Sequence, residues 1–275
     1  MPKKTRRSFE TNERSKNIVN EVMKSLRLRP MFHASARVTL PFALILAVAF
    51  AAIRAFAMLG PSNYRPLFLL HCIAMALVPW IFLDAIGRAE IGLKSSIRPW
   101  EFPLSMLYGA AASLMCFVVG YALFGVTADN WFVSIGNSFR AQPTVGFSLL
   151  QLHLMFTIPA MIFSPIGEEI FFRGFLQRAL ETKFDPRTSA VLEGTWFAAV
   201  HLVHHGLVVA ATGIEFRALS GALWFLLMLA LSCVFAWLRK RHDSIVPAIL
   251  AHSTFNFVMN LFIFGFLWNA AQRPS

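Results

Sequence analysis

The sequence predicts an all-α, polytopic membrane protein. Hydrophobic residues make up 57% of the chain, whereas charged residues make up only 14%. The mean hydropathy is +0.59, well outside the range of soluble globular domains. The apolar residues fall into stretches long enough to cross a bilayer as helices, for which about 20 residues suffice. We expect about seven to eight transmembrane helices.

Seven spans follow from the positions of the apolar stretches. They are residues 40–59, 66–86, 102–126, 147–163, 188–209, 219–238 and 245–267. With the N-terminus inside, every densely basic loop falls on one face, as the positive-inside rule requires. A partly embedded helix after residue 168 would be the eighth. The expected localisation is therefore a cell membrane, multi-pass, with a cytoplasmic N-terminus.

The positive charge is concentrated before the first span. The formal net charge is +11, and residues 1–37 contain ten basic and three acidic side chains. A basic segment beside a hydrophobic span is typical of a cytoplasmic arm that binds anionic lipid headgroups, so we expect no nucleic-acid partner. Because this arm is long, a cleaved signal peptide is not expected.

The expected organisation has four parts. Residues 1–37 form the basic arm, residues 38–146 the N-terminal helices, residues 147–268 a core that carries the polar motifs, and residues 269–275 a tail. The oligomeric state cannot be deduced from this pattern.

Two adjacent carboxylates, Glu168 and Glu169, follow the fourth span, and Arg173 comes shortly after them. A lone ionised carboxylate in hydrocarbon costs at least ~2.5–3.5 kcal/mol, so this pair needs partners or a function. In one helix, Glu169 and Arg173 are four residues apart and can pair. Glu168 lies about 100° around the helix and is left available for chemistry. Alternatively, both glutamates are surface charges at the membrane exit, neutralised by Arg173 and Arg178.

A helix boundary is expected just before these glutamates. Ser164 and Pro165 should break the fourth helix, because proline removes a backbone donor and clashes with the preceding turn. Gly167 then permits a new helix to begin. Near the first span, Arg54 is close enough to the end to extend its charged group towards water.

Further polar residues lie inside expected spans. His201 and His205 are four residues apart in the fifth span, and His252 and Asn256 are four apart in the last. Each pair therefore shares a helix face. With Glu168, these groups suit water-mediated acyl hydrolysis: a carboxylate and a neutral imidazole relay a proton, and a second histidine and an amide stabilise an oxyanion.

A zinc site is the alternative for the same side chains. His201, His205, Glu168 and His252 could ligate the metal, but no His-Glu-x-x-His signature is present. No serine lies in a Gly-x-Ser-x-Gly turn, so no covalent nucleophile stands out. The three cysteines, in separate apolar runs, indicate neither a disulfide framework nor a zinc knuckle. We therefore expect no cofactor.

Three motifs in this order resemble a known family. Glu168-Glu169-x-x-x-Arg173, Phe197-x-x-x-His201 and His252-x-x-x-Asn256 resemble the signature of the CAAX protease and bacteriocin-processing family, also called the Abi family. That family includes the Ras-converting type of prenyl-protein endopeptidase. The resemblance covers about residues 147–260.

The resemblance implies an intramembrane glutamate-type endopeptidase with about eight helices and a cavity open to the cytoplasmic side. It implies that Glu168 and His201 activate the water, that His252 and Asn256 hold the oxyanion, and that Glu169 and Arg173 are supporting residues. It implies no metal, although metal dependence was long assumed for the family. The relatives also favour a bacterial cytoplasmic membrane and a membrane protein or peptide as substrate.

Two other functional classes compete with the protease. A non-catalytic binding or immunity protein could keep the helical scaffold, but it would have no reason to bury four polar groups. A small transporter could line a pathway with them. However, transporters more often have paired repeats with broken helices in both halves, whereas here the polar groups lie in the second half.

Overall fold

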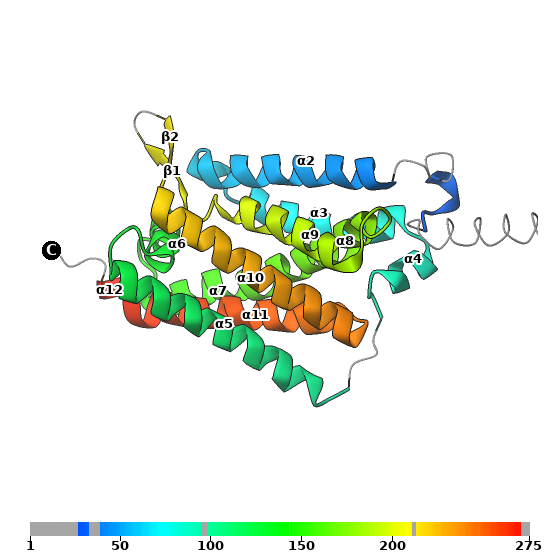
Figure 1. Ribbon diagram of the computed structural model, residues 1–275. Coiled ribbons are helices and arrows are strands. Elements are labelled where there is room, and N and C mark those ends of the chain that lie inside the picture. Colours follow the sequence, from blue (N-terminus) through cyan, green and yellow to red (C-terminus); the bar gives the residue numbers. More distant parts are fainter. Residues whose placement is uncertain (1–26, 33–38, 95–97, 143, 211–212, 271–275) are drawn as a thin grey trace, which may run out of the picture.

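The computed structural model describes residues 27–32, 39–94, 98–142, 144–210 and 213–270. Among these residues, seven long helices run roughly along one direction and form a single bundle (Figure 1). They are α2 (Thr39–Leu59), α3 (Leu67–Phe82), α5 (Glu101–Phe124), α7 (Leu149–Glu168), α9 (Pro186–His201), α10 (Ala218–His242) and α11 (Val246–Phe262). The expected basic arm and C-terminal tail lie largely outside the described residues.

Six helical segments are long and apolar enough to cross a membrane, and together they contain every long helix except α9. Helix α9 has 16 residues and packs along α10. The described chain is therefore a helical polytopic membrane protein, as expected. The shorter elements are η2 (Ser62–Tyr64), α4 (Ala85–Glu90), α6 (Trp131–Arg140), η3 (Glu169–Leu176), α8 (Gln177–Leu180), β1 (Leu207–Ala210), β2 (Gly213–Phe216), η4 (Ile263–Leu267) and α12 (Trp268–Ala270).

The bundle has two distinct ends (Figure 1). At the first, which we call the basic end, residues 27–32, 83–94, 98–100, 177–187 and 239–246 meet. Leu28 bridges to Leu83 there, and the amide of Ile245 donates to the carbonyl of Gly92 at 3.0 Å. At the second, the hairpin end, residues 60–66, 125–142, 144–148, 202–210, 213–217 and 268–270 meet.

Contacts between distant segments also define the hairpin end. Arg217 lies 3.2 Å from Asp129, and the Arg140 guanidinium donates to the carbonyl of Trp268. Successive helices connect one end to the other, so each loop belongs to one end only. The end of the bundle at which the interior opens therefore determines from which side of the membrane a ligand can enter.

The expected fifth span is wrong in its second half. Helix α9 ends at His201, and the strands β1 and β2 that follow pair antiparallel, with Leu207 opposite Phe216. Gly206 and Gly213 have φ of +109° and +127°, a region that glycine adopts without strain. The fold is therefore helical with one small added sheet.

The loop expected over residues 127–146 contains a helix. Asn130 caps α6 by accepting from the amide of Phe132 at 3.0 Å. Trp131 and Phe132 are fully buried in the core of the bundle. The second expected span also ends early, at Phe82, because Asp84 caps the separate helix α4.

The predicted break at Ser164 and Pro165 is wrong. Helix α7 passes through Pro159 and Pro165 and continues directly into η3, a π-helix over Glu169–Leu176. Proline is tolerated inside helices of membrane bundles because neighbouring groups satisfy the freed backbone. The helix is irregular slightly later in the chain, where it is π-helical from Glu169 onward. Short π-helical segments are frequent at functional sites. The eighth helix is thus a continuation of the fourth.

Helix α5 packs against α11 through a stripe of small residues. The buried small residues of α5 are Ser105, Gly109, Ser113, Cys116 and Gly120, three or four apart, and the last of them, Gly120, meets the ring of Trp131 in α6. A Cβ added to Gly109 would lie 2.0 Å from the carbonyl oxygen of Ala251, so the two backbones are in direct contact. Small residues at such spacing are the usual basis of close helix packing in membranes.

We expect Gly109→Ala to destabilise the protein by about 1–3 kcal/mol, the usual cost of overpacking. The added methyl group cannot fit without moving α5 away from α11. Thermal unfolding of the purified protein in detergent, followed by circular dichroism, would measure the change. Gly265→Ala is the matched control, because a Cβ there meets nothing within 4 Å. Equal stability of both variants would contradict the close packing.

Candidate active site

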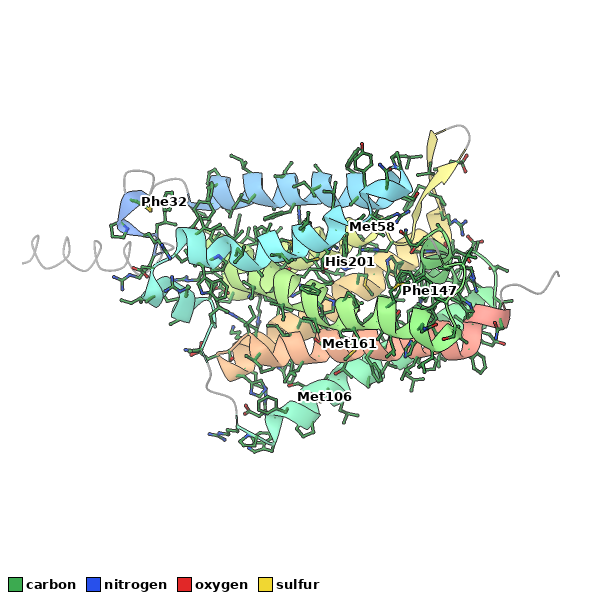
Figure 2. All side chains as sticks on the ribbon, turned by 180° about the vertical axis from the view of Figure 1, so that it is seen from behind. Phe32, Met58, Met106, Phe147, Met161 and His201 are labelled. Carbon is green, nitrogen blue, oxygen red and sulfur yellow. The ribbon has the colours of Figure 1, made fainter. Side chains whose placement is uncertain are left out.

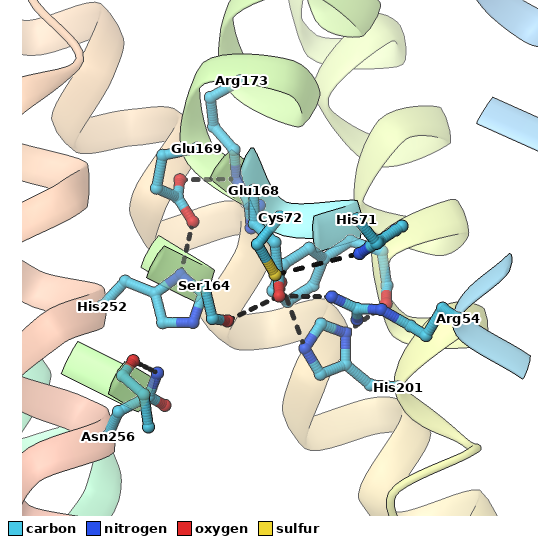
Figure 3. Close-up of polar contacts among 12 residues, drawn as sticks. Arg54, His71, Cys72, Ser164, Glu168, Glu169, Arg173, His201, His252 and Asn256 are labelled. Atoms are coloured by element: carbon cyan, nitrogen blue, oxygen red, sulfur yellow. Dashed lines mark hydrogen bonds and ion pairs between the residues drawn. The ribbon is translucent and has the colours of Figure 1, made fainter. Parts of the chain in front are cut away.

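The two adjacent glutamates belong to two separate polar networks (Figure 3). Glu168, the last residue of α7, faces Arg54 of α2 and His201 of α9. Glu169, the first residue of η3, faces Arg173 and His252. Both carboxylates are fully buried. The alternative that they are surface charges is therefore wrong.

The two carboxylate oxygens of Glu168 have different environments. Its Oε1 accepts from the Arg54 guanidinium and, at 2.6 Å, from the hydroxyl of Ser164. Its Oε2 lies 3.4 Å from Nε2 of His201 and makes no hydrogen bond with any described residue. Oε2 is therefore the oxygen available to a water molecule.

Arg54 is the ionic partner of Glu168, which the sequence interpretation left unpaired. The expectation that Arg54 extends towards water is wrong, because its side chain is 1% exposed and its guanidinium lies 5.1 Å from the ring centroid of Phe68. A buried carboxylate needs a counter-charge. In the sequence, this role was indicated by the position of Arg54, a charged residue inside an otherwise apolar span.

The hydrogen bonds of His201 define its tautomer. Its Nδ1 lies 2.7 Å from the carbonyl oxygen of Phe197. Because a carbonyl can only accept, Nδ1 carries a hydrogen, and in the neutral ring Nε2 presents a lone pair. This lone pair points towards Glu168. The two groups are thus arranged to share a proton, or to bind one water molecule jointly from the cavity side.

The second network joins four helical segments. Arg173 Nε lies 3.2 Å from Glu169, which confirms the expected i, i+4 pair, and Nη1 lies 3.7 Å from Glu193 of α9. The other oxygen of Glu169 lies 2.7 Å from Nδ1 of His252 on α11. Ser232 of α10 donates to Glu193 at 3.4 Å. Sequence reasoning missed Glu193, although a carboxylate within an expected span was visible.

Aromatic rings surround this network. The Arg173 guanidinium lies 3.9 Å from the ring centroid of Phe197 and 5.2 Å from that of Phe235. The imidazole of His252 stacks on Phe235 with 5.1 Å between centroids. The rings exclude water from the ions, which strengthens each interaction. His252 is therefore fixed in position by both a carboxylate and a ring face.

Asn256 lies one helical turn beyond His252. One amide N–H of Asn256 donates to the carbonyl of Ala160 at 2.8 Å, which ties α11 to α7. An amide has two N–H donors, so a second one is left for a ligand. Neither Asn256 nor His252 contacts Glu168 directly.

A cavity of about 320 Å³ brings the predicted residues together. Its polar lining includes all four predicted catalytic residues: Glu168, His201, His252 and Asn256. The rest of the wall is largely apolar, with Phe156, Trp224 and Met228 among its members. In the reverse view (Figure 2), His201 and Met58, which also lines the cavity, lie on the side of the bundle nearer the hairpin, away from Phe32. Such a pocket suits an apolar segment of a ligand with a polar group at its reactive end.

Two neighbouring histidines have different environments. His204 lines the cavity beside Phe68, with 5.6 Å between ring centroids. His205 is buried against Trp131, and burial lowers the pKa of His205 to about 4, so its ring is neutral near pH 7. The expectation that His201 and His205 share a helix face is wrong, because α9 ends at His201, and His205 does not line the cavity.

Several donor groups near the cavity are engaged by other side chains of the protein. Within the described part of the chain, no three His, Cys, Asp or Glu side chains are grouped so as to hold one. The Arg54 guanidinium occupies one oxygen of Glu168, and Glu169 binds Nδ1 of His252. The three cysteines, Cys72, Cys116 and Cys233, are unpaired.

One family model matches part of the chain. Residues 150–258 match the Rce1-like family, described as type II CAAX prenyl endopeptidase Rce1-like. The match contains all three motifs and confirms the family resemblance that they suggested. No curated protein and no solved structure matched the chain.

Proposed function

We propose that this protein, which contains the Rce1-like segment, is a membrane endopeptidase that hydrolyses a peptide bond of a membrane-associated protein or peptide. The observation that carries the proposal is the geometry at Glu168: a buried carboxylate oxygen without a hydrogen bond, 3.4 Å from an imidazole nitrogen, at the wall of an apolar cavity. The family match supports the same class of reaction.

In this mechanism, Glu168 and His201 hold the attacking water. As the water attacks the carbonyl carbon, its proton passes to this pair, and the same pair returns a proton to the departing amine. Arg54 and Ser164 fix the orientation of the carboxylate through its other oxygen. The same two residues, Glu168 and His201, therefore carry out both proton transfers.

His252 and Asn256 would stabilise the oxyanion. When His252 carries both ring protons, Nε2 can donate to the oxyanion while Nδ1 stays bound to Glu169, which supplies the counter-charge. The free N–H of Asn256 is the second donor. Removing one such donor typically lowers kcat about 10²–10³-fold.

No metal takes part in this proposal, because the guanidinium beside Glu168 would repel a cation. We expect the purified enzyme to keep its activity after dialysis against EDTA. Loss of activity on chelation, restored by added zinc, would refute the metal-free mechanism.

The test of function compares membrane fractions of cells that express the wild type, Glu168→Gln or no protein. Expression of both proteins must be equal. Substrates should lose a peptide segment only with the wild type, and mass spectrometry would identify the cleavage site. If Glu168→Gln behaves as the wild type while deletion does not, the protein acts by binding, as an immunity protein would.

Glu169→Gln tests the supporting role of Glu169. The amide oxygen can still accept from Nδ1 of His252, but the counter-charge is lost. We expect kcat to fall by less than the roughly 10²–10³-fold cost of losing an oxyanion donor, which His252→Ala should show in full. Steady-state kinetics of both variants on one peptide would measure this. An equal loss in both would mean that Glu169 takes part in the chemistry itself.

We also infer that the basic end faces the cytoplasm of a bacterial cell. The Lys and Arg residues at this end include Arg27, Arg29, Arg88, Lys94, Arg98, Arg178, Lys183, Arg187, Arg239, Lys240 and Arg241. At the hairpin end, the described residues include only Arg65, Arg140 and Arg217. This asymmetry favours a cytoplasmic basic end by the positive-inside rule. The anionic inner leaflet would then bind the basic arm.

A further inference from the structure

The cavity is connected to one end of the bundle. Its outer lining comes from residues at or near the hairpin end, namely Met58, Arg65, Ser138, Gln142 and His204. Its inner limit is at Glu168 and His252. No residue of the basic end lines the cavity among the residues that the structure describes.

Tight packing separates the cavity from the basic end. Every residue of η3 is buried, and Phe171, Arg173 and Phe175 are fully so. A Cβ on Gly167 would lie 2.2 Å from the carbonyl oxygen of Cys72, so α7 and α3 leave no gap beside Glu168. A peptide approaching from the basic end would have to displace this core.

Two expectations from the sequence therefore conflict. The cavity mouth is lined by residues of the hairpin end. A cytoplasmic N-terminus and a cavity open to the cytoplasm cannot both hold, because the basic end and the hairpin end lie at opposite ends of the bundle (Figure 1). The charge asymmetry is a direct physical determinant of orientation. The cytoplasmic cavity was implied only by resemblance.

We propose that the cavity opens on the non-cytoplasmic face of the membrane. This inference rests on the proposed function in one respect: the substrate is then a polypeptide segment exposed outside the cytoplasm, such as the outer end of a membrane-inserted peptide. A lipid-modified C-terminus confined to the cytosol cannot reach Glu168. The apolar wall suits a segment that emerges from the bilayer rather than one in free solution.

Cysteine labelling tests the orientation without depending on catalysis. In a variant with Cys72, Cys116 and Cys233 replaced by alanine, single cysteines are introduced by Gln142→Cys at the mouth and Lys183→Cys at the basic end. A membrane-impermeant maleimide should label Gln142→Cys in intact cells to the level reached after permeabilisation. Lys183→Cys should be labelled only after permeabilisation.

Ser62→Cys is the second reporter at the hairpin end, because this residue is exposed whereas Gln142 is partly buried. It keeps the test decisive if the thiol at Gln142 reacts slowly. Labelling of Lys183→Cys in intact cells, with Ser62→Cys protected, would overturn the proposal. Correct folding is checked by an unchanged elution volume in size-exclusion chromatography.

A second measurement separates this inference from the proposed function. Glu168→Gln in the same background should give the same labelling pattern, whether or not the protein is a peptidase. With an active enzyme and its identified substrate, a bulky impermeant maleimide on Gln142→Cys should lower cleavage in intact cells at least tenfold. The same reagent should leave cleavage by Lys183→Cys unchanged. Unaltered cleavage after complete labelling of Gln142→Cys would exclude entry at the hairpin end.

Discussion

Glu168→Gln is expected to lower kcat by about 10²–10⁴-fold, the usual contribution of a positioned general base. The amide keeps the shape of the side chain, and its oxygen can still accept from Arg54 and Ser164. It cannot take a proton from water. KM should change little, because the cavity walls are unaffected.

A double-mutant cycle with His201→Ala sharpens this result. If Glu168 and His201 act as one unit on the water, the double variant should be no slower than the slower single variant. Independent roles would instead give losses that multiply. Single-turnover measurements on a fluorogenic peptide would distinguish the two.

The control for this cycle is Glu215→Gln, which changes an exposed carboxylate on the hairpin. It should leave kcat within twofold of the wild type. Each variant must also unfold at the temperature of the wild type within a few degrees. A Glu168→Gln protein that retains kcat would eliminate Glu168 as the base.

Arg173→Met is expected to cause the largest loss of stability, about 3–5 kcal/mol, as found when one partner of a buried ion pair is removed. The arginine is fully buried, and its loss leaves Glu169 and Glu193 without their shared counter-charge. Unfolding in detergent, followed by tryptophan fluorescence against denaturant, would measure the change.

A triple variant tests the electrostatic origin of this loss. Adding Glu169→Gln and Glu193→Gln to Arg173→Met removes the unpaired charges, so most of the stability should return. Lys183→Met is the control, because exposed substitutions usually stay within about 0.5 kcal/mol. If the triple variant is as unstable as the single one, packing of the guanidinium against Phe197 and Phe235 is the larger contribution.

Hydropathy was sufficient for the long helices other than α9, because each of these carries a continuous run of apolar side chains. It was insufficient for α6 and the hairpin, which are short and depend on individual contacts such as the burial of Trp131. The expected break at Pro165 was wrong for a related reason. Proline chemistry is local, whereas the course of α7 is determined by the helices around it.

For the site, sequence spacing identified Glu169 with Arg173 because both lie on one helix. Arg54 and Glu193 were missed because their partners are on other helices, and no spacing rule connects them. Spacing also left Glu168 unpaired, since its counter-charge comes from more than 100 residues earlier in the chain. Contacts between distant segments require the three-dimensional arrangement.

We expect the contact between α5 and α11 to affect the proposed reaction, although α5 contributes no side chain to the cavity. Ala251, whose carbonyl touches Gly109, directly precedes His252. A displacement of α5 would therefore move the α11 backbone that carries the imidazole of His252. A genetic screen for inactive alleles should recover substitutions at Gly109 and its small neighbours, and their protein should still reach the membrane in measurable amounts.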